Sequence, residues 1–207
     1  MRLMKWCTGL CLVAALAFSA IGQADAQDKK KEKKKVTPKV KVGDKAPAFE
    51  SVDETGAPFK SADVVGKKVV ILYFYPADFT GGCTAQACGF RDNIDKLGSK
   101  NVLVLGVSGD SVATHKLFKA HHKLNFPLLA DEKGTVAKAF GVPVNKGGKS
   151  PTIDETGKKG QAERGVTIAR WTVVIGLDGN VAAIDQVGNA GGDAKRIAEI
   201  IKKLETN

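Results

Sequence analysis

The sequence predicts an α/β fold in which a central mixed sheet is flanked by helices. Residues 69–75 and 102–107 form two apolar runs that are continuous rather than alternating, which indicates strands buried on both faces. Between these runs, the apolar residues of segment 82–97 recur at helical spacing. The three segments therefore predict a strand–helix–strand unit, a building block of sheets covered by helices.

The other expected elements follow in chain order. A second helix is expected over residues 111–124, where apolar and histidine side chains recur three or four positions apart. Two strands, 171–175 and 181–184, flank an Asp-Gly turn and so predict a hairpin. A short strand at 126–130, a short helix at 135–140 and a closing helix at 193–204 complete the expected fold.

Segment 144–167 interrupts this pattern, because Lys, Gly, Ser and Glu dominate it. The sequence predicts an exposed, mobile insertion here, covering residues 146–165. Positions 148–150 read Gly-Lys-Ser, as in part of a phosphate-binding loop, but Pro143 stands where that motif needs its first glycine. Nucleotide binding is therefore not expected.

The N-terminus has the pattern of a secretory signal peptide. Arg2 and Lys5 precede an apolar stretch of about 12 residues, and Ala24-Asp25-Ala26 fits a cleavage site. The apolar stretch is shorter than the roughly 20 residues that a spanning helix needs. We therefore expect residues 1–26 to be removed and the protein to be exported, to the periplasm or another extracytoplasmic space, without stable membrane insertion.

Behind the signal peptide, the chain divides into a Lys-rich flexible tail, 27–41, and a single domain, 42–207. The formal net charge is +10, and six of the lysines lie together in segment 27–35. No aromatic residues interleave with that lysine run, as they would in many nucleic-acid interfaces. The charge therefore predicts a solvated tail, and no nucleic-acid partner is expected.

Two thiols, Cys83 and Cys88, flank the expected strand-to-helix junction, and no other cysteine lies outside the predicted signal peptide. If the helix starts near Gly82, Cys83 lies in its first turn, where free N–H groups and the helix dipole favour a thiolate. Thr80 is then a natural cap. Five residues along a helix place the two Cα atoms about 8.6 Å apart, beyond the roughly 7 Å that a disulfide spans. A bond between them would require at least one turn to unwind.

The residues around these thiols resemble a known family. Segment 76–83, P-A-D-F-T-G-G-C, fits the peroxiredoxin pattern P-x-x-x-T-x-x-C, and its continuation to Asp92 is similar to the bacterioferritin comigratory, or Q-type, subgroup. The resemblance covers roughly residues 42–204. Further matching segments are Gly-Val-Ser-x-Asp at 106–110, F-P-L-L-A-D at 126–131 and Arg-Trp-Thr at 170–172.

This resemblance implies a thioredoxin-like fold and a thiol-dependent peroxidase that reduces hydrogen peroxide and organic hydroperoxides. Cys83 would be oxidised to a sulfenic acid, and Cys88 would condense with it to form an intramolecular disulfide. Thr80 would hold the peroxide through its hydroxyl group. Arg170 would stabilise the thiolate and polarise the O–O bond, with Arg164 as the fallback for that role.

The remaining expected site residues are Pro76, Gly82 and Gln86. Gln86 matches the position that lies beside the arginine in the family. Pro76 fixes the chain as it leaves the strand, and Gly82 lets a small substrate approach the backbone closely. The expected partners are a hydroperoxide and a thioredoxin-like or other dithiol reductant, and the expected assembly is a monomer or weak homodimer. No metal or organic cofactor is expected.

Two other classes of function stay open at this point. One is a thiol-disulfide oxidoreductase without peroxidase activity, which would normally carry C-x-x-C. The other is a non-catalytic protein with a structural disulfide, which the helical spacing of Cys83 and Cys88 disfavours. The adjacent His121 and His122 point to different helix faces, so they are not expected to bind a metal.

Overall fold

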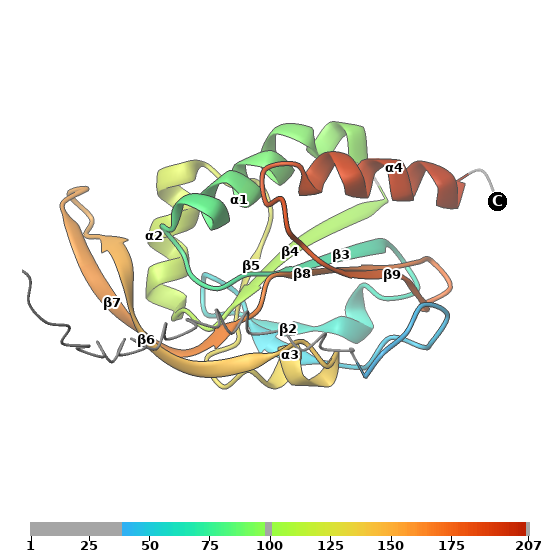
Figure 1. The fold of residues 1–207 in the computed structure, drawn as a ribbon, viewed down its shortest axis with the longest axis horizontal. Coiled ribbons are helices and arrows are strands. Elements are labelled where there is room, and N and C mark those ends of the chain that lie inside the picture. Colours follow the sequence, from blue (N-terminus) through green and yellow to red (C-terminus); the bar gives the residue numbers. More distant parts are fainter. Residues whose placement is uncertain (1–38, 98–100, 206–207) are drawn as a thin grey trace, which may run out of the picture. The chain divides into compact units, whose positions relative to one another are not determined.

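The computed structural model describes residues 39–97 and 101–205, which form a five-stranded mixed sheet covered by helices (Figure 1). The strand order is β5-β4-β3-β8-β9. Strand β3 is parallel to β4 and antiparallel to β8. The five strands are β3 (Val69–Phe74), β4 (Val102–Ser108), β5 (Leu128–Ala130), β8 (Trp171–Ile175) and β9 (Val181–Gln186). The expected signal peptide, 1–26, and most of the expected tail, 27–41, lie outside the described residues.

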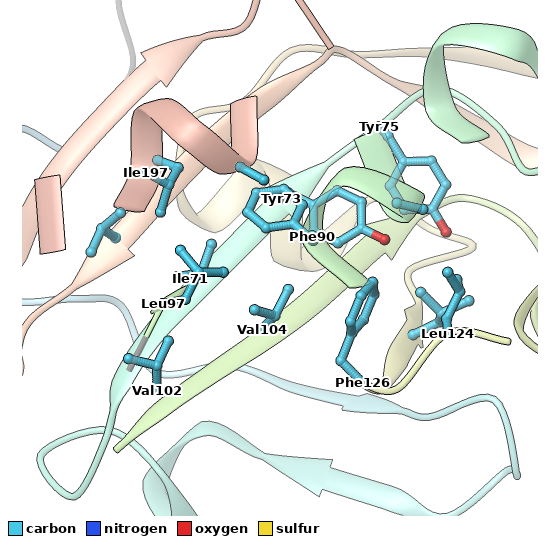
Figure 2. Close-up of a cluster of buried hydrophobic side chains, with 14 of the residues drawn as sticks. Ile71, Tyr73, Tyr75, Phe90, Leu97, Val102, Val104, Leu124, Phe126 and Ile197 are labelled. Atoms are coloured by element: carbon cyan, nitrogen blue, oxygen red, sulfur yellow. The ribbon is translucent and has the colours of Figure 1, made fainter. Parts of the chain in front are cut away.

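Strand β3 lies at the centre of the sheet, and all six of its residues are buried. Because side chains alternate between the two faces of a strand, β3 contributes to two separate cores. Ile71 and Tyr73 pack in one core, with Phe90 and Ile197 from helices above the sheet (Figure 2). Leu72 and its even-numbered neighbours pack in the other core. The prediction of a strand buried on both faces is confirmed.

Helices cover both faces of the sheet (Figure 1). Helices α1 (Gly81–Asn93) and α4 (Asp193–Glu205) pack against each other on the first core, and α3 (Thr135–Ala139) contributes to the second. A 3-10 turn, Ile94–Leu97, follows α1, and Lys123 ends α2 (Val112–His122) in the left-handed conformation. All four helices were predicted from the sequence, α1 and α2 from the spacing of their side chains. Within the described part of the chain, no helix is long and apolar enough to cross a membrane.

Two short strands were not predicted, β1 (Glu50–Val52) and β2 (Pro58–Lys60). They pair antiparallel with each other, outside the main sheet. Each is three residues long and carries a single partly buried central residue. Strands this short leave almost no periodic pattern in a sequence, which explains why they were missed.

The predicted mobile insertion at 146–165 is instead a regular antiparallel hairpin, β6 (Val144–Ile153) and β7 (Lys159–Ile168). Its turn is fixed by Asp154, whose side chain accepts hydrogen bonds from the backbone N–H groups of Thr156 (2.9 Å) and Lys158 (3.0 Å). The ends of the hairpin nearest the sheet pack on the second core. The sequence did not predict these two strands, whereas most side chains of the hairpin are exposed or only partly buried, as expected.

Candidate active site

The junction between β3 and α1 carries most of the expected site. Helix α1 begins at Gly81, so Cys83 lies in its first turn, as predicted. Thr80 occupies the cap position, but its side chain makes no capping hydrogen bond. Its hydroxyl group donates instead to the carbonyl of Ala77 at 3.0 Å. The hydroxyl oxygen can still accept a hydrogen bond from another group.

The guanidinium of Arg170 contacts the thiol of Cys83. Nη2 of Arg170 lies 3.1 Å from Sγ of Cys83, although the two residues are 87 positions apart in the chain. Strand pairing explains this contact, because Trp171 lies opposite Phe74 at the end of β3 where the chain turns toward α1. Only 1% of Cys83 is exposed. A positive guanidinium and the N-terminus of a helix therefore both face this buried sulfur, and each would interact favourably with a negative charge on it.

A chain of hydrogen bonds continues from Arg170 into the protein. Its Nη1 donates to Oε1 of Gln86 at 2.5 Å. Nε2 of Gln86 donates to Oδ2 of Asp193 at 2.8 Å, and the same oxygen accepts from Oγ1 of Thr172 at 2.6 Å. The side chains of Gln86, Thr172 and Asp193 are buried. Gln86 was expected beside the arginine, whereas no pattern in the sequence pointed to Thr172 or Asp193.

Cys88 lies farther along the same continuous helix and is partly exposed. Both cysteines in the described part of the chain are free thiols. In a regular helix their Cα atoms are about 8.6 Å apart, which is too far for a disulfide. The structure therefore represents a reduced form, and a bond between the two thiols would require α1 to unwind locally.

The other expected residues take different positions. Arg164 lies on the hairpin and donates to Oγ1 of Thr167 from Nε (3.1 Å) and Nη2 (3.0 Å), so Arg170 and not Arg164 contacts the thiol. A Cβ atom at Gly82 would lie 3.4 Å from Nη2 of Arg170, so a methyl group there would touch the guanidinium at the short end of ordinary van der Waals contact. Pro76 is partly buried in the segment that leads from β3 to α1.

Sequence reasoning missed a buried polar cluster beneath this segment. Asp78 accepts a hydrogen bond from the hydroxyl group of Tyr75 at 2.7 Å, and its other carboxylate oxygen lies 2.7 Å from Nδ1 of His115. The backbone N–H of Asp78 donates to Oδ2 of Asp110 at 2.9 Å, and Ser108 donates to the same oxygen at 2.7 Å. The cluster therefore ties the segment before α1 to α2 and to the end of β4.

Burial and neighbouring charge shift the titration of this cluster. Burial, helped by the charge of Asp78, raises the pKa of Asp110. Burial alone would lower the pKa of His115, but the charge and hydrogen bond of Asp78, together with Asp110, outweigh burial and raise it. In the sequence, His115 shows only the spacing of three or four positions that predicts the helix. Spacing alone cannot distinguish a histidine that is fully buried beside two carboxylates from one that only packs on the apolar face of its helix.

A cavity of about 460 Å³ lies near the start of α1, and Cys83 itself is not among its lining residues. Its walls include Phe79 and Thr84, the residues that directly precede Thr80 and directly follow Cys83. Other lining residues come from the hairpin, including Pro151 and Ile153. His121 and His122 also line this cavity, and their rings lie about 6 Å from the ring of Phe79. Within residues 39–97 and 101–205, no three His, Cys, Asp or Glu side chains are arranged to hold a metal ion.

Comparisons with known proteins agree on one family. The model of the AhpC/TSA family matches residues 42–184. A putative peroxiredoxin bcp of Coxiella burnetii is 45% identical over 148 residues, which cover 70% of this chain and 96% of that protein. Peroxiredoxin Q, chloroplastic, of Oryza sativa subsp. japonica is 46% identical over 168 residues, covering 81% of this chain and 68% of that protein.

Solved structures give the same result. Peroxidoxin BcpB from Mycobacterium tuberculosis superposes with a TM-score of 0.65 at 30% identity, covering 80% of this chain and 98% of that one. A peroxiredoxin Q from Xanthomonas campestris gives a TM-score of 0.60 at 26% identity, covering 75% of this chain and 90% of that one.

Proposed function

The chain belongs to the AhpC/TSA family and is a thiol-dependent peroxidase with a thioredoxin-like fold, and we propose that Cys83 is the thiol that attacks the hydroperoxide. The contact of 3.1 Å between Nη2 of Arg170 and Sγ of Cys83 carries this proposal. A nucleophilic thiol must react as the thiolate, and this guanidinium together with the start of α1 stabilises that form. Cys88, which lies beyond the first turn of the helix, has no such contact with Arg170.

The first step is a nucleophilic displacement at oxygen. The Cys83 thiolate forms an S–O bond with the terminal peroxide oxygen while the O–O bond breaks. The leaving hydroxide or alkoxide takes up a proton, so sulfur is oxidised by two electrons and the hydroperoxide is reduced to water or an alcohol. Arg170 would stabilise the negative charge that moves onto the leaving oxygen, and the Thr80 hydroxyl oxygen would accept a hydrogen bond from the O–H group of the bound hydroperoxide.

In the second step, the Cys88 thiolate attacks the sulfenic sulfur of Cys83. An S–S bond forms, the S–O bond breaks, and the oxygen leaves as water after protonation. Because both residues lie on one regular helix, this step requires α1 to unwind around them. A thioredoxin-like dithiol reductant then exchanges with the disulfide and restores both thiols.

The cavity lined by Phe79 and Thr84, near the start of α1, supports the use of organic hydroperoxides. Its apolar walls, Phe79, Pro151 and Ile153, would bury the organic substituent of a hydroperoxide that binds near the start of α1. A charged side chain in this wall, as in Ile153→Asp, should slow the reaction with cumene hydroperoxide and leave the reaction with hydrogen peroxide unchanged. Equal slowing with both substrates would argue against this use of the cavity.

We also propose that the protein is exported, which the signal-peptide pattern of residues 1–26 supports. Mass spectrometry of the mature protein should find Gln27 at its N-terminus. Recovery of the full chain from the cytoplasm would contradict export. The predicted monomer or weak homodimer stays a prediction, which analytical ultracentrifugation tests directly.

Paired cysteine variants test the catalytic proposal. Cys83→Ser should abolish peroxide consumption, because serine has no accessible anion at neutral pH. Cys88→Ser should consume one equivalent of peroxide and then stop until an external thiol reduces the sulfenic acid. In the wild-type protein, rapid mixing with peroxide should remove both free thiols within seconds. Full turnover by the Cys83→Ser variant would exclude Cys83 as the attacking thiol, and loss of neither thiol would favour a non-catalytic role.

A further inference from the structure

The amide of Gln86 lies between a cation and an anion. Its oxygen accepts from Nη1 of Arg170 at 2.5 Å, and its nitrogen donates to Oδ2 of Asp193 at 2.8 Å. An amide has one acceptor end and one donor end, so only one of its two orientations satisfies both neighbours. If the amide were reversed, its NH₂ group would face the guanidinium and its oxygen would face a carboxylate.

Asp193 is itself held firmly in place in the first turn of α4. Only 1% of the residue is exposed. Oδ2 also accepts from Oγ1 of Thr172 at 2.6 Å, and Oδ1 accepts from Nε (3.1 Å) and Nη2 (2.8 Å) of Arg196. An ionised carboxylate has only acceptors, and here every neighbour is a donor. The site therefore suits an aspartate and no side chain that carries a donor.

We propose that Asp193 is a positioning residue for peroxide reduction. It fixes the orientation of the Gln86 amide, and that amide directs the guanidinium of Arg170 toward Sγ of Cys83. Asp193 does not touch the thiol and acts only through these two side chains. The inference rests on the proposed roles of Cys83 and Arg170, and it adds a residue from α4 that neither the thiol motif nor the arginine motif contains.

The geometry of the guanidinium explains why orientation matters. Arg170 contacts Gln86 through Nη1 and Cys83 through Nη2. If the Gln86 oxygen moves, the guanidinium must rotate to follow it, and Nη2 then moves relative to Sγ of Cys83. The planar guanidinium cannot bend to keep both contacts. Small displacements of a group that stabilises a transition state cost large factors in rate, up to about 100-fold for roughly 1 Å.

Variants that exchange hydrogen-bond donors and acceptors at Asp193 and Gln86 test the proposal. In Asp193→Asn, the new NH₂ group must face either Gln86 or Arg196, both of which are donors. We expect the second-order rate of Cys83 oxidation by hydrogen peroxide to fall roughly tenfold, the change that about 1.4 kcal/mol produces. The pH at which this rate reaches half its maximum should also move upward. In Gln86→Glu, a carboxylate would keep the contact with Arg170 but face Asp193, so a similar fall is expected.

The double variant, Gln86→Glu with Asp193→Asn, should restore the rate. The NH₂ group of the new asparagine would donate to the new glutamate, and its oxygen would accept from Arg196. We expect a rate within about threefold of wild type, which would be a strong positive coupling between the two positions. A purely structural role of Asp193 gives no reason for such rescue. The Gln86→Glu single variant keeps the comparison possible if Asp193→Asn alone does not fold.

Asp185→Asn is the matched control. Arg196, the arginine that binds Asp193, also donates from Nη1 to Oδ2 of Asp185 at 2.7 Å. Asp185 has no hydrogen bond to Gln86. This variant makes the same change of charge and should react with peroxide at the wild-type rate. The proposal is overturned if Asp193→Asn keeps the wild-type rate and pH profile, or if the double variant is as slow as the singles. Either result would leave the role of Cys83 intact, because that role depends on the separate Cys83→Ser experiment.

Discussion

Oδ2 of Asp78 lies 2.7 Å from Nδ1 of His115, and both side chains are completely buried. The other ring nitrogen of His115 lies 3.3 Å from the carbonyl oxygen of Leu129, which can only accept a hydrogen bond. Both ring nitrogens therefore face acceptors, an arrangement that suits the charged imidazolium. The pair joins the segment that carries Thr80 and Cys83 to the middle of α2.

Replacing this histidine should change how stability depends on pH. Asp78 and Asp110 raise the pKa of His115 above 6.5, its ordinary value, despite the opposing effect of burial. The folded state therefore binds the proton more tightly than the unfolded state does. The stabilisation is fully present below pH 6.5 and is lost as the pH rises through the raised pKa of the folded protein.

His115→Gln removes this titration. We expect the difference in free energy of unfolding between wild type and variant to be largest below pH 6.5 and to shrink at higher pH. Urea unfolding of both proteins at a series of pH values measures this difference in the free energy of unfolding. His121→Gln, at an exposed position on the same helix, is the matched control and should show no such trend. A difference that grows with rising pH would contradict an imidazolium in the folded protein.

The arginine that contacts the thiol should control the first chemical step. Arg170→Met removes a hydrogen bond to a charged sulfur, which is worth about 1.5–3 kcal/mol, so the rate with hydrogen peroxide should fall roughly 10- to 100-fold. Arg164→Met removes an arginine that binds Thr167 on the hairpin and should leave the rate unchanged. Stopped-flow measurement of thiol oxidation by hydrogen peroxide compares the rates of the two variants with that of the wild type. An equal loss in both variants would indicate general electrostatic steering instead of a specific contact.

The sequence predicted the parts of the fold that rest on local patterns. Strand β3 is buried on both faces, so its continuous apolar run had no competing interpretation. The contact of Arg170 with Cys83 followed only from the family resemblance, since no spacing rule connects residues 87 positions apart. Asp193 could not be predicted, because an aspartate in the first turn of a helix is ordinary and its role depends on side chains from α1 and β8.

The hairpin was missed for a different reason. Its strands are rich in Lys and Gly, which are uncommon in strands, and cross-strand pairing and a few contacts at its base stabilise it. At that base, the backbone N–H of Gly165 donates to the carbonyl of Gly109 at 3.1 Å. A Cβ atom at Gly109 would lie 2.2 Å from the carbonyl oxygen of Val166. Contacts of this kind between distant backbone segments leave no pattern in the sequence.

These contacts predict a difference between two glycine variants. Gly109→Ala should destabilise the protein by about 1–3 kcal/mol, because the backbone of β7 must move to admit the methyl group. Gly148→Ala, in β6, should change the stability by less than about 1 kcal/mol, since a Cβ atom there has no neighbour within 4 Å. Thermal unfolding of both variants provides the measurement. If the two variants are equally stable, the backbone at the base of the hairpin can move to admit the methyl group at little cost in free energy.

The unwinding of α1 is open to a separate test at Gly89. A Cβ atom there would lie 3.6 Å from the carbonyl oxygen of Gly191 and 3.8 Å from Cβ of Ala194, which are ordinary contact distances. Gly89→Ala should therefore fit, and alanine in a helix interior is favoured over glycine by about 0.5–1 kcal/mol. Because Cys88 must leave the helix to reach the sulfenic acid, we expect disulfide formation to slow roughly two- to fivefold.

The same variant should leave the first step unchanged, because Cys83 and Arg170 keep their contact. Trapping the sulfenic acid at intervals after rapid mixing with peroxide measures the two steps separately. A longer-lived sulfenic acid should also give more irreversible sulfinic acid at high peroxide. Gly89→Ala in the Cys88→Ser background is the control, where no disulfide can form and the two proteins should behave alike. Disulfide formation at the wild-type rate would mean that the helix around Gly89 stays folded while the two sulfurs join.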